Sequence, residues 1–298
     1  MILIADSGST KTTWMEIESG NTLVTEGLNP HFTSDAQFLA ACQLVKGDTL
    51  SSTTALQWSP SPKLGEVDTE GGRRSVSVYF YGAGCGSKVQ RQRVKTLLQK
   101  AFETKNVHVE TDMLGACRAV CGDQPGIVGI LGTGSNACYY DGKKIKYQEI
   151  STGYILGDFG SANHVGRVLL NDYLTHRMSP NLRSKFRKTY QMSDDQLMDA
   201  LYHQPHPNRF LASLAPFAVQ NISNFYFYKI ISNTLVDWWI EVLLKLIQKV
   251  DNPEIKLHIV GGYAKAIEPT LRYWMEDCGA TVDTVMADPI DGLRQYHK

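Results

Sequence analysis

The chain repeats one order of predicted elements, and each copy carries a turn of small residues after its first strand. In the first half, the apolar run Met1–Ala5 leads into Asp6-Ser-Gly-Ser-Thr-Lys11. In the second half, the buried-type strand 126–131 leads into Gly132-Thr-Gly-Ser-Asn136. Turns of this kind can present backbone N–H groups to phosphate oxygens. An ordinary hairpin turn explains one of them equally well, but two in one chain favour a pair of phosphate loops.

The hydrophobic patterns extend this repeat over the whole chain. The first half predicts strands at 1–5, 12–17, 22–27, 75–81 and 107–111, with helices after Ser34 and at 87–102. The second half predicts strands at 126–131, 136–140, 143–148, 256–260 and 281–285. Its predicted helices lie at 161–175, 182–190 and 194–202, with a long one at about 216–249.

The order strand-strand-strand-helix-strand-helix-strand therefore occurs twice. It predicts an α/β protein with two similar domains, 1–115 and 116–298, around a central cleft. The last helix could pack back on the first domain. The segment 47–75 is rich in Ser, Thr, Gly and Pro, and it is predicted to be a long surface loop.

Composition excludes several classes of function. The 298 residues hold 30 basic and 30 acidic side chains, and this zero net charge argues against nucleic acid as the main partner. No apolar stretch approaches the roughly 20 residues that a membrane span needs, and Asp6 interrupts the first apolar run too early for a signal peptide. Six scattered cysteines favour reduced, buried thiols in a cytoplasmic protein. Cys117 and Cys121 lie one helical turn apart, but no second pair completes a structural metal site.

The polar residues of the first turn suit a nucleotide with its metal ion. Asp6 can hold Mg²⁺, usually through a water molecule, because hard cations prefer oxygen ligands. Gly8 lets the backbone approach phosphate oxygens closely, and the hydroxyls of Ser9 and Thr10 lie beside it. We therefore expect the first turn to face the phosphates of a bound nucleotide.

Taken together, the motifs resemble those of the actin-like ATPase and sugar kinase superfamily, whose domains have a ribonuclease H-like fold. Asp6–Lys11 is similar to its first phosphate motif, Gly132–Asn136 to the second, and Ile259–Gly262 to the adenosine motif. More narrowly, Thr111-Asp112, Leu131–Ala137 and Gly157-Asp-Phe-Gly-Ser-Ala162 resemble N-acetylglucosamine kinase. That family is grouped with activator ATPases of benzoyl-CoA reductase and hydroxyacyl-CoA dehydratase.

The resemblance implies a role for each matching residue. Asp112 would be the catalytic base that aligns and deprotonates a sugar hydroxyl for in-line attack on the γ-phosphorus of ATP. Asp6 would hold Mg²⁺, and the nucleotide would be bound by Gly8, Ser9, Thr10, Lys11, Gly132, Thr133, Gly134, Gly261, Gly262 and Lys265. The sugar would be bound by Asn29, Ser151, Thr152, Gly153 and Asp158.

Structural roles remain open for three of these residues. Asp112 could instead cap the helix that follows it, and Asp158 could cap the helix that starts near Ser161. Asn29 precedes Pro30 and could simply form a turn. In addition, Phe159 stands where the kinases of this family typically carry Glu, and a glycine-rich adenine-side segment is missing near Ala218–Asn221.

These features predict an ATP-dependent kinase that phosphorylates a hydroxyl of an amino sugar or N-acetylhexosamine, with N-acetylglucosamine as the expected substrate. The alternative is an ATPase activator, which shares an iron–sulfur cluster between two subunits. Its cysteine-bearing loop does not follow the second phosphate motif, because Cys138 falls within a predicted strand. A sugar sensor without turnover ranks third. The resemblance also implies a homodimer that binds a small sugar, with neither nucleic acid nor membrane as partner.

Overall fold

The computed structural model describes residues 1–49, 76–250, 252 and 254–298. These residues form two compact units, Met1–Gly122 together with Pro289–Lys298, and Asp123–Asp288. The predicted boundary after residue 115 falls inside helix α3 (Asp112–Cys121), which belongs whole to the first unit. The predicted loop 47–75 lies mostly outside the described residues, and residues 47–49 end helix α1.

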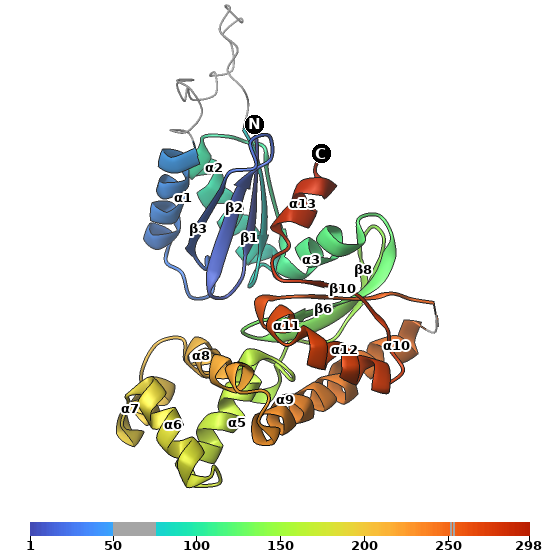
Figure 1. The fold of residues 1–298 in the computed structure, drawn as a ribbon. Helices are drawn as coiled ribbons and strands as arrows, with labels where there is room; N and C mark the ends of the chain where they lie inside the picture. Colours follow the sequence, from blue (N-terminus) through green and yellow to red (C-terminus); the bar gives the residue numbers. More distant parts are fainter. Residues whose placement is uncertain (50–75, 251, 253) are drawn as a thin grey trace, which may run out of the picture. The chain divides into compact units, whose positions relative to one another are not determined.

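The first unit is built on one mixed sheet. Its strands are β1 (Ile2–Ser7), β2 (Lys11–Glu16), β3 (Thr22–Glu26), β4 (Ser77–Gly82) and β5 (Val107–Thr111). They lie in the order β3-β2-β1-β4-β5, with β1 antiparallel to β2 and parallel to β4 (Figure 1). Helices α1 (Asp35–Thr49) and α2 (Lys88–Phe102) cover one face, and α3 and α13 (Ile290–Tyr296) belong to the other.

The second unit repeats this sheet. Its strands are β6 (Pro125–Leu131), β7 (Ser135–Asp141), β8 (Ile145–Gln148), β9 (Leu257–Val260) and β10 (Val282–Met286). Their order, β10-β9-β6-β7-β8, is that of the first sheet read from the other edge. This match confirms the predicted repeat.

Helices make up most of the rest of the second unit. They are α4 (Gly153–Leu156), α5 (Ala162–Leu174), α6 (Pro180–Tyr190), α7 (Asp194–Tyr202), α8 (Pro207–Gln220), α9 (Phe225–Trp238), α10 (Leu244–Val250), α11 (Gly262–Ala266) and α12 (Glu268–Asp277). A π-helical turn, Trp239–Leu243, joins α9 to α10. No helix in the described part of the chain combines the length and the hydrophobicity that crossing a bilayer requires.

The single long helix predicted at about 216–249 is wrong. Pro207 occupies the first turn of α8, where its missing N–H costs nothing, and the helix continues past Pro216 to Gln220. A turn then separates α8 from α9, and the side chain of Asn224 accepts a hydrogen bond from Tyr226 N (3.0 Å) to start the new helix. The apolar pattern crosses both helices, so it concealed this break.

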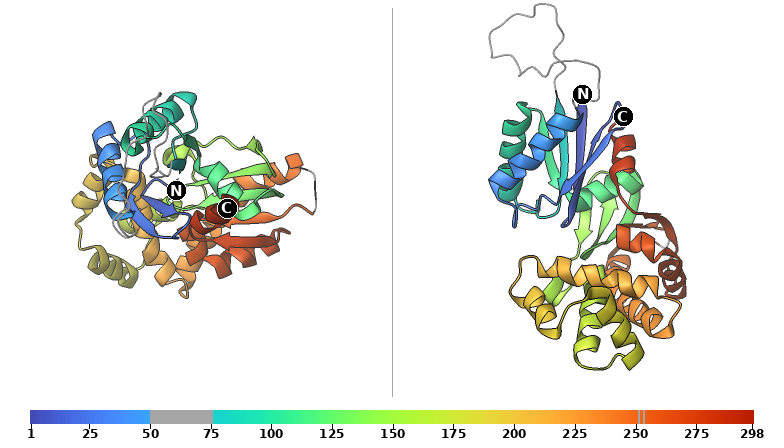
Figure 2. Two further views of the ribbon diagram at one scale, coloured as in Figure 1. Left: turned by 90° about the horizontal axis from the view of Figure 1, so that it is seen from above. Right: turned by 60° about the vertical axis from the view of Figure 1, so that its left-hand side comes forward.

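The strand alternation places a core on each face of the first sheet. Trp14 packs with the α1 and α2 face, whereas its neighbour Met15 packs with Ile290 and Leu293 of α13 on the other face. Figure 2 shows α13 alongside the β1–β2 part of this sheet. The second unit has one large core, formed mainly by its helices and by alternate residues of β6, β9 and β10.

Tyr81 ties the C-terminal segment to α3 within the first unit. Its hydroxyl oxygen accepts a hydrogen bond from Arg118 Nη1 (2.9 Å) and shares another with His297 Nε2 (2.8 Å). Burial raises the pKa of Tyr81 to about 12 and lowers the pKa of His297 to about 4, so both groups are neutral near pH 7. Gly115 of α3 lies directly against the ring, because a Cβ there would be 2.8 Å from the Cβ and Cγ atoms of Tyr81.

We expect Gly115→Ala to destabilise the protein by about 1–3 kcal/mol, because overpacking forces α3 away from Tyr81. The matched control is Gly47→Ala in α1, where a new Cβ meets no heavy atom within 4 Å. That substitution should stabilise by up to about 1 kcal/mol, the usual gain of alanine over glycine in a helix. Urea unfolding of both variants measures the difference, and equal effects of the same sign would contradict the packing argument.

Candidate functional site

The first predicted phosphate turn joins β1 to β2 and is held on its inner side. Gly8 N donates to the Lys11 carbonyl (2.9 Å), and Gly27 N donates to the Thr10 carbonyl (3.0 Å). Gly27 packs directly under the turn, since a Cβ there would lie 2.7 Å from the carbonyl oxygens of Gly8 and Ser9. At Gly8 itself a Cβ would meet only Lys11 O, at 3.7 Å. The turn is therefore fixed on the side that faces Gly27 and has open space at Gly8. A phosphate loop requires such space for the ligand.

Two buried hydroxyls at the base of this turn were missed by the sequence analysis. Ser7 Oγ and Thr12 Oγ1 lie 2.8 Å apart, and Leu28 N donates to both, at 3.1 and 3.2 Å. Thr12 Oγ1 also donates to the Glu26 carbonyl (3.0 Å). Ser7 lies within the motif Asp6–Lys11 and Thr12 directly follows it, which was the available signal. They hold the segment that carries Asn29 next to the turn.

Asp6 and Asp112 lie at the same edge of the first sheet. The parallel pairing aligns Ser7 of β1 with Gly82 of β4, and Gly82 with Thr111 of β5. Asp6 therefore precedes the aligned row by one residue, and Asp112 follows it by one. Ligand sites of α/β folds occur at this carboxyl edge of the strands.

Asp112 is the first residue of α3, but it is not the helix cap. Thr111 has that role, because its hydroxyl accepts a hydrogen bond from Leu114 N (3.2 Å). Asp112 Oδ1 accepts from Met113 N (2.9 Å). Burial raises the pKa of the Asp112 carboxyl, although hydrogen bonds from the backbone of Met113 and Asp112 oppose the shift. A carboxylate with a raised pKa is a stronger proton acceptor.

Asn29 is buried and fixed at this edge. Its Oδ1 accepts a hydrogen bond from His31 N (3.0 Å), and it lies against Gly84 in the turn after β4. The Asn29 carbonyl accepts from the backbone of Phe32 and Thr33. Asn29 therefore does form a turn, which is the structural role that the sequence left open. The same turn places its carboxamide beside the end of β4.

The second predicted phosphate turn joins β6 to β7 and is clamped to the start of α5. Gly132 N donates to the Gly134 carbonyl (2.9 Å). Ala162 N donates to the Gly132 carbonyl (3.0 Å), and Asn163 N donates to the Thr133 carbonyl (3.1 Å). A Cβ at Gly132 would meet no heavy atom within 4 Å, so the backbone there is open to a ligand.

Asp158 links this turn to α5 through its carboxylate. Its Oδ1 accepts a hydrogen bond from Ser135 N (3.2 Å), and its Oδ2 accepts from Asn163 Nδ2 (2.8 Å). A Cβ at Gly134 would lie 2.7 Å from Oδ2, so Gly134 lets the carboxylate reach the turn. The cap of α5 is Ser161, whose side chain accepts from His164 N, and the capping role considered for Asp158 is absent.

Two residues that were not predicted from the sequence, Asn163 and Arg167, influence the charge of Asp158. Burial raises the pKa of the Asp158 carboxyl, while hydrogen bonds from Asn163 and Ser135 and the charge of Arg167 oppose the shift. Asn163 is completely buried, and its Oδ1 has no hydrogen-bond partner. Arg167 Nη1 donates to the carbonyls of Tyr154 (2.9 Å) and Ile155 (3.2 Å), which fixes α4. No local motif marks either residue.

The adenosine-motif glycines lie beside the second turn. Gly261 has φ +139°, and a side chain there would collide with the Leu131 carbonyl, so only glycine brings these two strand ends so close. A Cβ at Gly262 would meet no heavy atom within 4 Å. Lys265, in contrast, is half-exposed, and its Nζ forms an ion pair with Glu268 (2.6 Å) on the surface.

The predicted sugar segment Ser151–Gly153 leads into α4. Ser151 and Thr152 are exposed, and Gly153 has φ +70°. Gly157 N donates to the Gly153 carbonyl (2.8 Å) and so joins this segment to the turn that carries Asp158.

The cysteines do not form a site. None of the six forms a disulfide, and five of them, including Cys117 and Cys121, are buried, which agrees with the prediction of reduced thiols. Among the described residues, no group of three or more His, Cys, Asp or Glu side chains could hold a metal ion. A metal that uses one carboxylate together with phosphate oxygens remains compatible with Asp6, since Mg²⁺ is commonly bound in that way.

Two solved structures described as "putative N-acetylglucosamine kinase" match this chain. The Porphyromonas gingivalis protein shares 33% identity and a TM-score of 0.84, over 100% of this chain and 98% of the other. The Chromobacterium violaceum protein shares 16% identity and a TM-score of 0.72, with the same coverage. A ROK family glucokinase from Streptomyces griseus, solved with glucose and AMPPNP, shares the fold at 14% identity and a TM-score of 0.57, over 99% of this chain and 97% of the other. No family model and no curated protein matches the chain.

His164 makes the Asp158 turn sensitive to acid. Its Nδ1 accepts a hydrogen bond from Gly160 N (3.2 Å), which requires an unprotonated Nδ1. Its Nε2 lies 3.9 Å from Asp237 Oδ2. Burial, with a smaller contribution from the charge of Arg167, lowers the pKa of His164 to about 4. The unfolded chain therefore binds a proton at higher pH than the folded chain.

We expect the free energy of unfolding to be unaffected by His164 above about pH 6.5. It should fall by up to about 1.4 kcal/mol per pH unit between that value and pH 4. His164→Asn keeps an acceptor oxygen without the titration, so urea unfolding of this variant at several pH values should show a shallower loss. His203→Asn, at the exposed position directly after α7, is the control. An unchanged acid profile in His164→Asn would show that other groups cause the loss.

Proposed function

We propose that this chain, which belongs to the N-acetylglucosamine kinase family of the actin-like ATPase and sugar kinase superfamily, transfers the γ-phosphoryl group of ATP to a hydroxyl of N-acetylglucosamine. The family makes it an ATP-dependent sugar kinase, and the acetylated amino sugar is the finer part of the proposal. The observation that carries it is the partly buried carboxylate of Asp158 beside the second phosphate turn. An ionised carboxylate can accept hydrogen bonds from two adjacent sugar hydroxyls.

The proposal assigns a different task to each unit. In the first unit, Asp112 accepts the proton of the attacking hydroxyl, and Asn29 binds the sugar. The turn Gly8–Lys11 binds phosphate oxygens through its backbone. In the second unit, Gly132–Gly134 binds phosphates, Gly261 and Gly262 border the adenosine, and Asp158 with Ser151–Gly153 binds the sugar ring.

Asp6 fits the magnesium ion that such a transfer needs. Its carboxylate supplies the hard oxygen ligand that Mg²⁺ prefers, or accepts a hydrogen bond from one of its bound waters. When bound, Mg²⁺ neutralises phosphate charge. The surface ion pair of Lys265 makes this lysine the weakest of the proposed nucleotide ligands, because the amine would have to leave Glu268.

An ATPase activator is the less favoured function. Its iron–sulfur cluster needs cysteine side chains that reach a partner subunit. Here five of the six thiols are buried, and burial raises the pKa of Cys42 and Cys85 to about 12, which disfavours the thiolate form that binds iron. Cys138 lies buried within β7.

The substrate can be identified with a coupled assay of ADP release. Glucosamine, N-acetylglucosamine, N-acetylmannosamine, N-acetylmuramate and glucose would be compared at equal concentrations. We expect N-acetylglucosamine to give the highest kcat/KM. A clear preference for glucose would contradict the assignment of an N-acetyl sugar, while leaving the sugar kinase assignment intact.

We expect Asp112→Asn to retain nucleotide affinity and to lower kcat by about 10²–10⁴-fold, the usual effect of a lost general base. The substitution keeps the side-chain shape and the oxygen that accepts from Met113 N. Calorimetry with AMPPNP and the coupled assay measure the two quantities. Asp123→Asn, at an exposed position after α3, should behave as the wild type. Turnover near the wild-type rate in Asp112→Asn would exclude the role of base.

Asp6→Ala should abolish Mg²⁺-dependent turnover without unfolding the chain, because it removes the carboxylate at the first turn. Asp6→Asn keeps the shape and removes only the charge, so a similar loss in both variants would assign the effect to the carboxylate. Turnover is measured against Mg²⁺ concentration, with circular dichroism as the check on folding. An unchanged dependence on Mg²⁺ would place the metal elsewhere.

A further inference from the structure

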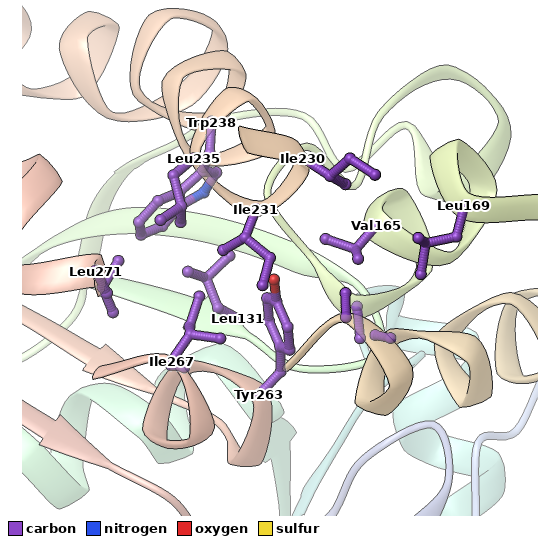
Figure 3. Packing of buried hydrophobic residues seen from close by; sticks show 14 of the residues in the cluster. Leu131, Val165, Leu169, Ile230, Ile231, Leu235, Trp238, Tyr263, Ile267 and Leu271 are labelled. Carbon is purple, nitrogen blue, oxygen red and sulfur yellow. The ribbon is translucent and has the colours of Figure 1, made fainter. Parts of the chain in front are cut away.

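Trp238, the last residue of α9, lies behind the turn that carries Asp158. Its side chain is completely buried, and it packs with Leu131, Ile231 and Leu235 in the core of the second unit (Figure 3). Leu131 is the last residue of β6 and directly precedes the second phosphate turn. The indole therefore belongs to the core that supports the second phosphate turn.

Two glycines far apart in the sequence make room for this side chain. A Cβ at Gly160 would lie 2.6 Å from Trp238 Cβ and 3.1 Å from its Cγ. A Cβ at Gly129 would lie 2.7 and 2.8 Å from the Cζ2 and Cη2 atoms at the far edge of the indole. The side chain thus reaches from the Asp158 turn at one end to strand β6 at the other. Real Cβ contacts are not this close, so neither position tolerates a side chain without movement of the indole.

The backbone departs from regular geometry directly after Trp238 and in the Asp158 turn that packs against it. The π-helical turn Trp239–Leu243 begins immediately after it, and single turns of this kind are frequent at functional sites. Asp158 and Gly160 have φ +51° and +74°, and a left-handed conformation is uncommon at residues other than glycine. The hydrogen bonds of Asp158 hold it on one side, and Trp238 closes the other side of the turn.

We infer that Trp238 is a positioning residue for sugar binding, which sets the separation between the Asp158 turn and the strand that leads into the second phosphate turn. In the proposed site Trp238 contacts neither ATP nor the sugar. It acts through its packing against Gly160 and Gly129. The inference rests on the proposed function for its effect on the sugar. Its structural part, the coupling of the two segments, can be tested without any ligand.

The test compares Trp238→Phe with Trp274→Phe in the intact chain. Trp274 lies in the same unit on α12, is partly buried, and donates from Nε1 to Ser232 Oγ (2.8 Å). Both substitutions replace an indole with a phenyl ring, so the control matches the change in side-chain volume. Hydrogen exchange is measured over 132–136 and 157–163, together with the Kd for N-acetylglucosamine by calorimetry and the kinetic constants.

Trp238→Phe should increase exchange in both segments and raise the sugar Kd by about tenfold, whereas Trp274→Phe should change the Kd by less than about threefold. Gly129→Ala should also weaken sugar binding, because the new methyl group displaces the indole. The double variant Gly129→Ala with Trp238→Phe should be less impaired than the sum of the single effects, because the smaller ring leaves space for that methyl group.

Equal exchange or equal sugar affinity in the two tryptophan variants would overturn the inference, as would strictly additive effects in the double variant. Increased exchange in Trp238→Phe, combined with a wild-type protein that binds and phosphorylates no sugar, would instead refute the proposed function and confine Trp238 to a structural role. The two failures are therefore distinguishable.

Discussion

The hydrogen bonds of the Asp158 carboxylate hold together the functional parts of the second unit. Ser135 N and Asn163 Nδ2 each donate to one oxygen, so the carboxylate joins the second phosphate turn to the start of α5. Burying a charge is costly unless such donors compensate it, and burial raises the pKa of the Asp158 carboxyl although these donors oppose the shift. Each oxygen can accept a further hydrogen bond. A ligand that donates two of them would complete the solvation of this partly buried charge, which gives a physical reason for the sugar binding proposed at this position.

The two sheets have the same strand order, but their turns are stabilised by different chemistry. The first turn depends on the paired hydroxyls of Ser7 and Thr12 and on the close approach of Gly27. The second depends on the N-terminal residues of α5 and on a charged side chain. A repeated topology therefore fixes where the turns lie, and local side chains determine what each turn can bind. This division explains why a metal-binding carboxylate is proposed for the first unit and a sugar-binding carboxylate for the second.

Most of the fold could be predicted from the sequence, because alternating apolar residues and turn residues determine strands and turns over only a few neighbouring positions. The predicted strand at 107–111 has the observed bounds, and the repeat of strand order is confirmed. The break between α8 and α9 was missed because an apolar face continues across it. Asp112 and Asp158 could be proposed from the sequence because each stands in a motif that also contains glycine. Asn163 and Trp238 could not, because no motif marks them and their contacts include Thr133 and Gly129, which are distant from them in the chain. Gly129, a glycine inside a buried strand, was a local sign of a close approach.

The strength of the proposed base depends on the packing of α3. Asp112 begins this helix, and the positive end of a helix favours the ionised form of a carboxylate. Burial nevertheless raises the pKa of the Asp112 carboxyl, so desolvation outweighs the hydrogen bonds from the backbone of Met113 and Asp112. Desolvation persists only while α3 stays in place, and Tyr81 holds α3 through Gly115 and Arg118. Because His297 bonds the same hydroxyl, the C-terminal segment also helps to hold Tyr81 against α3.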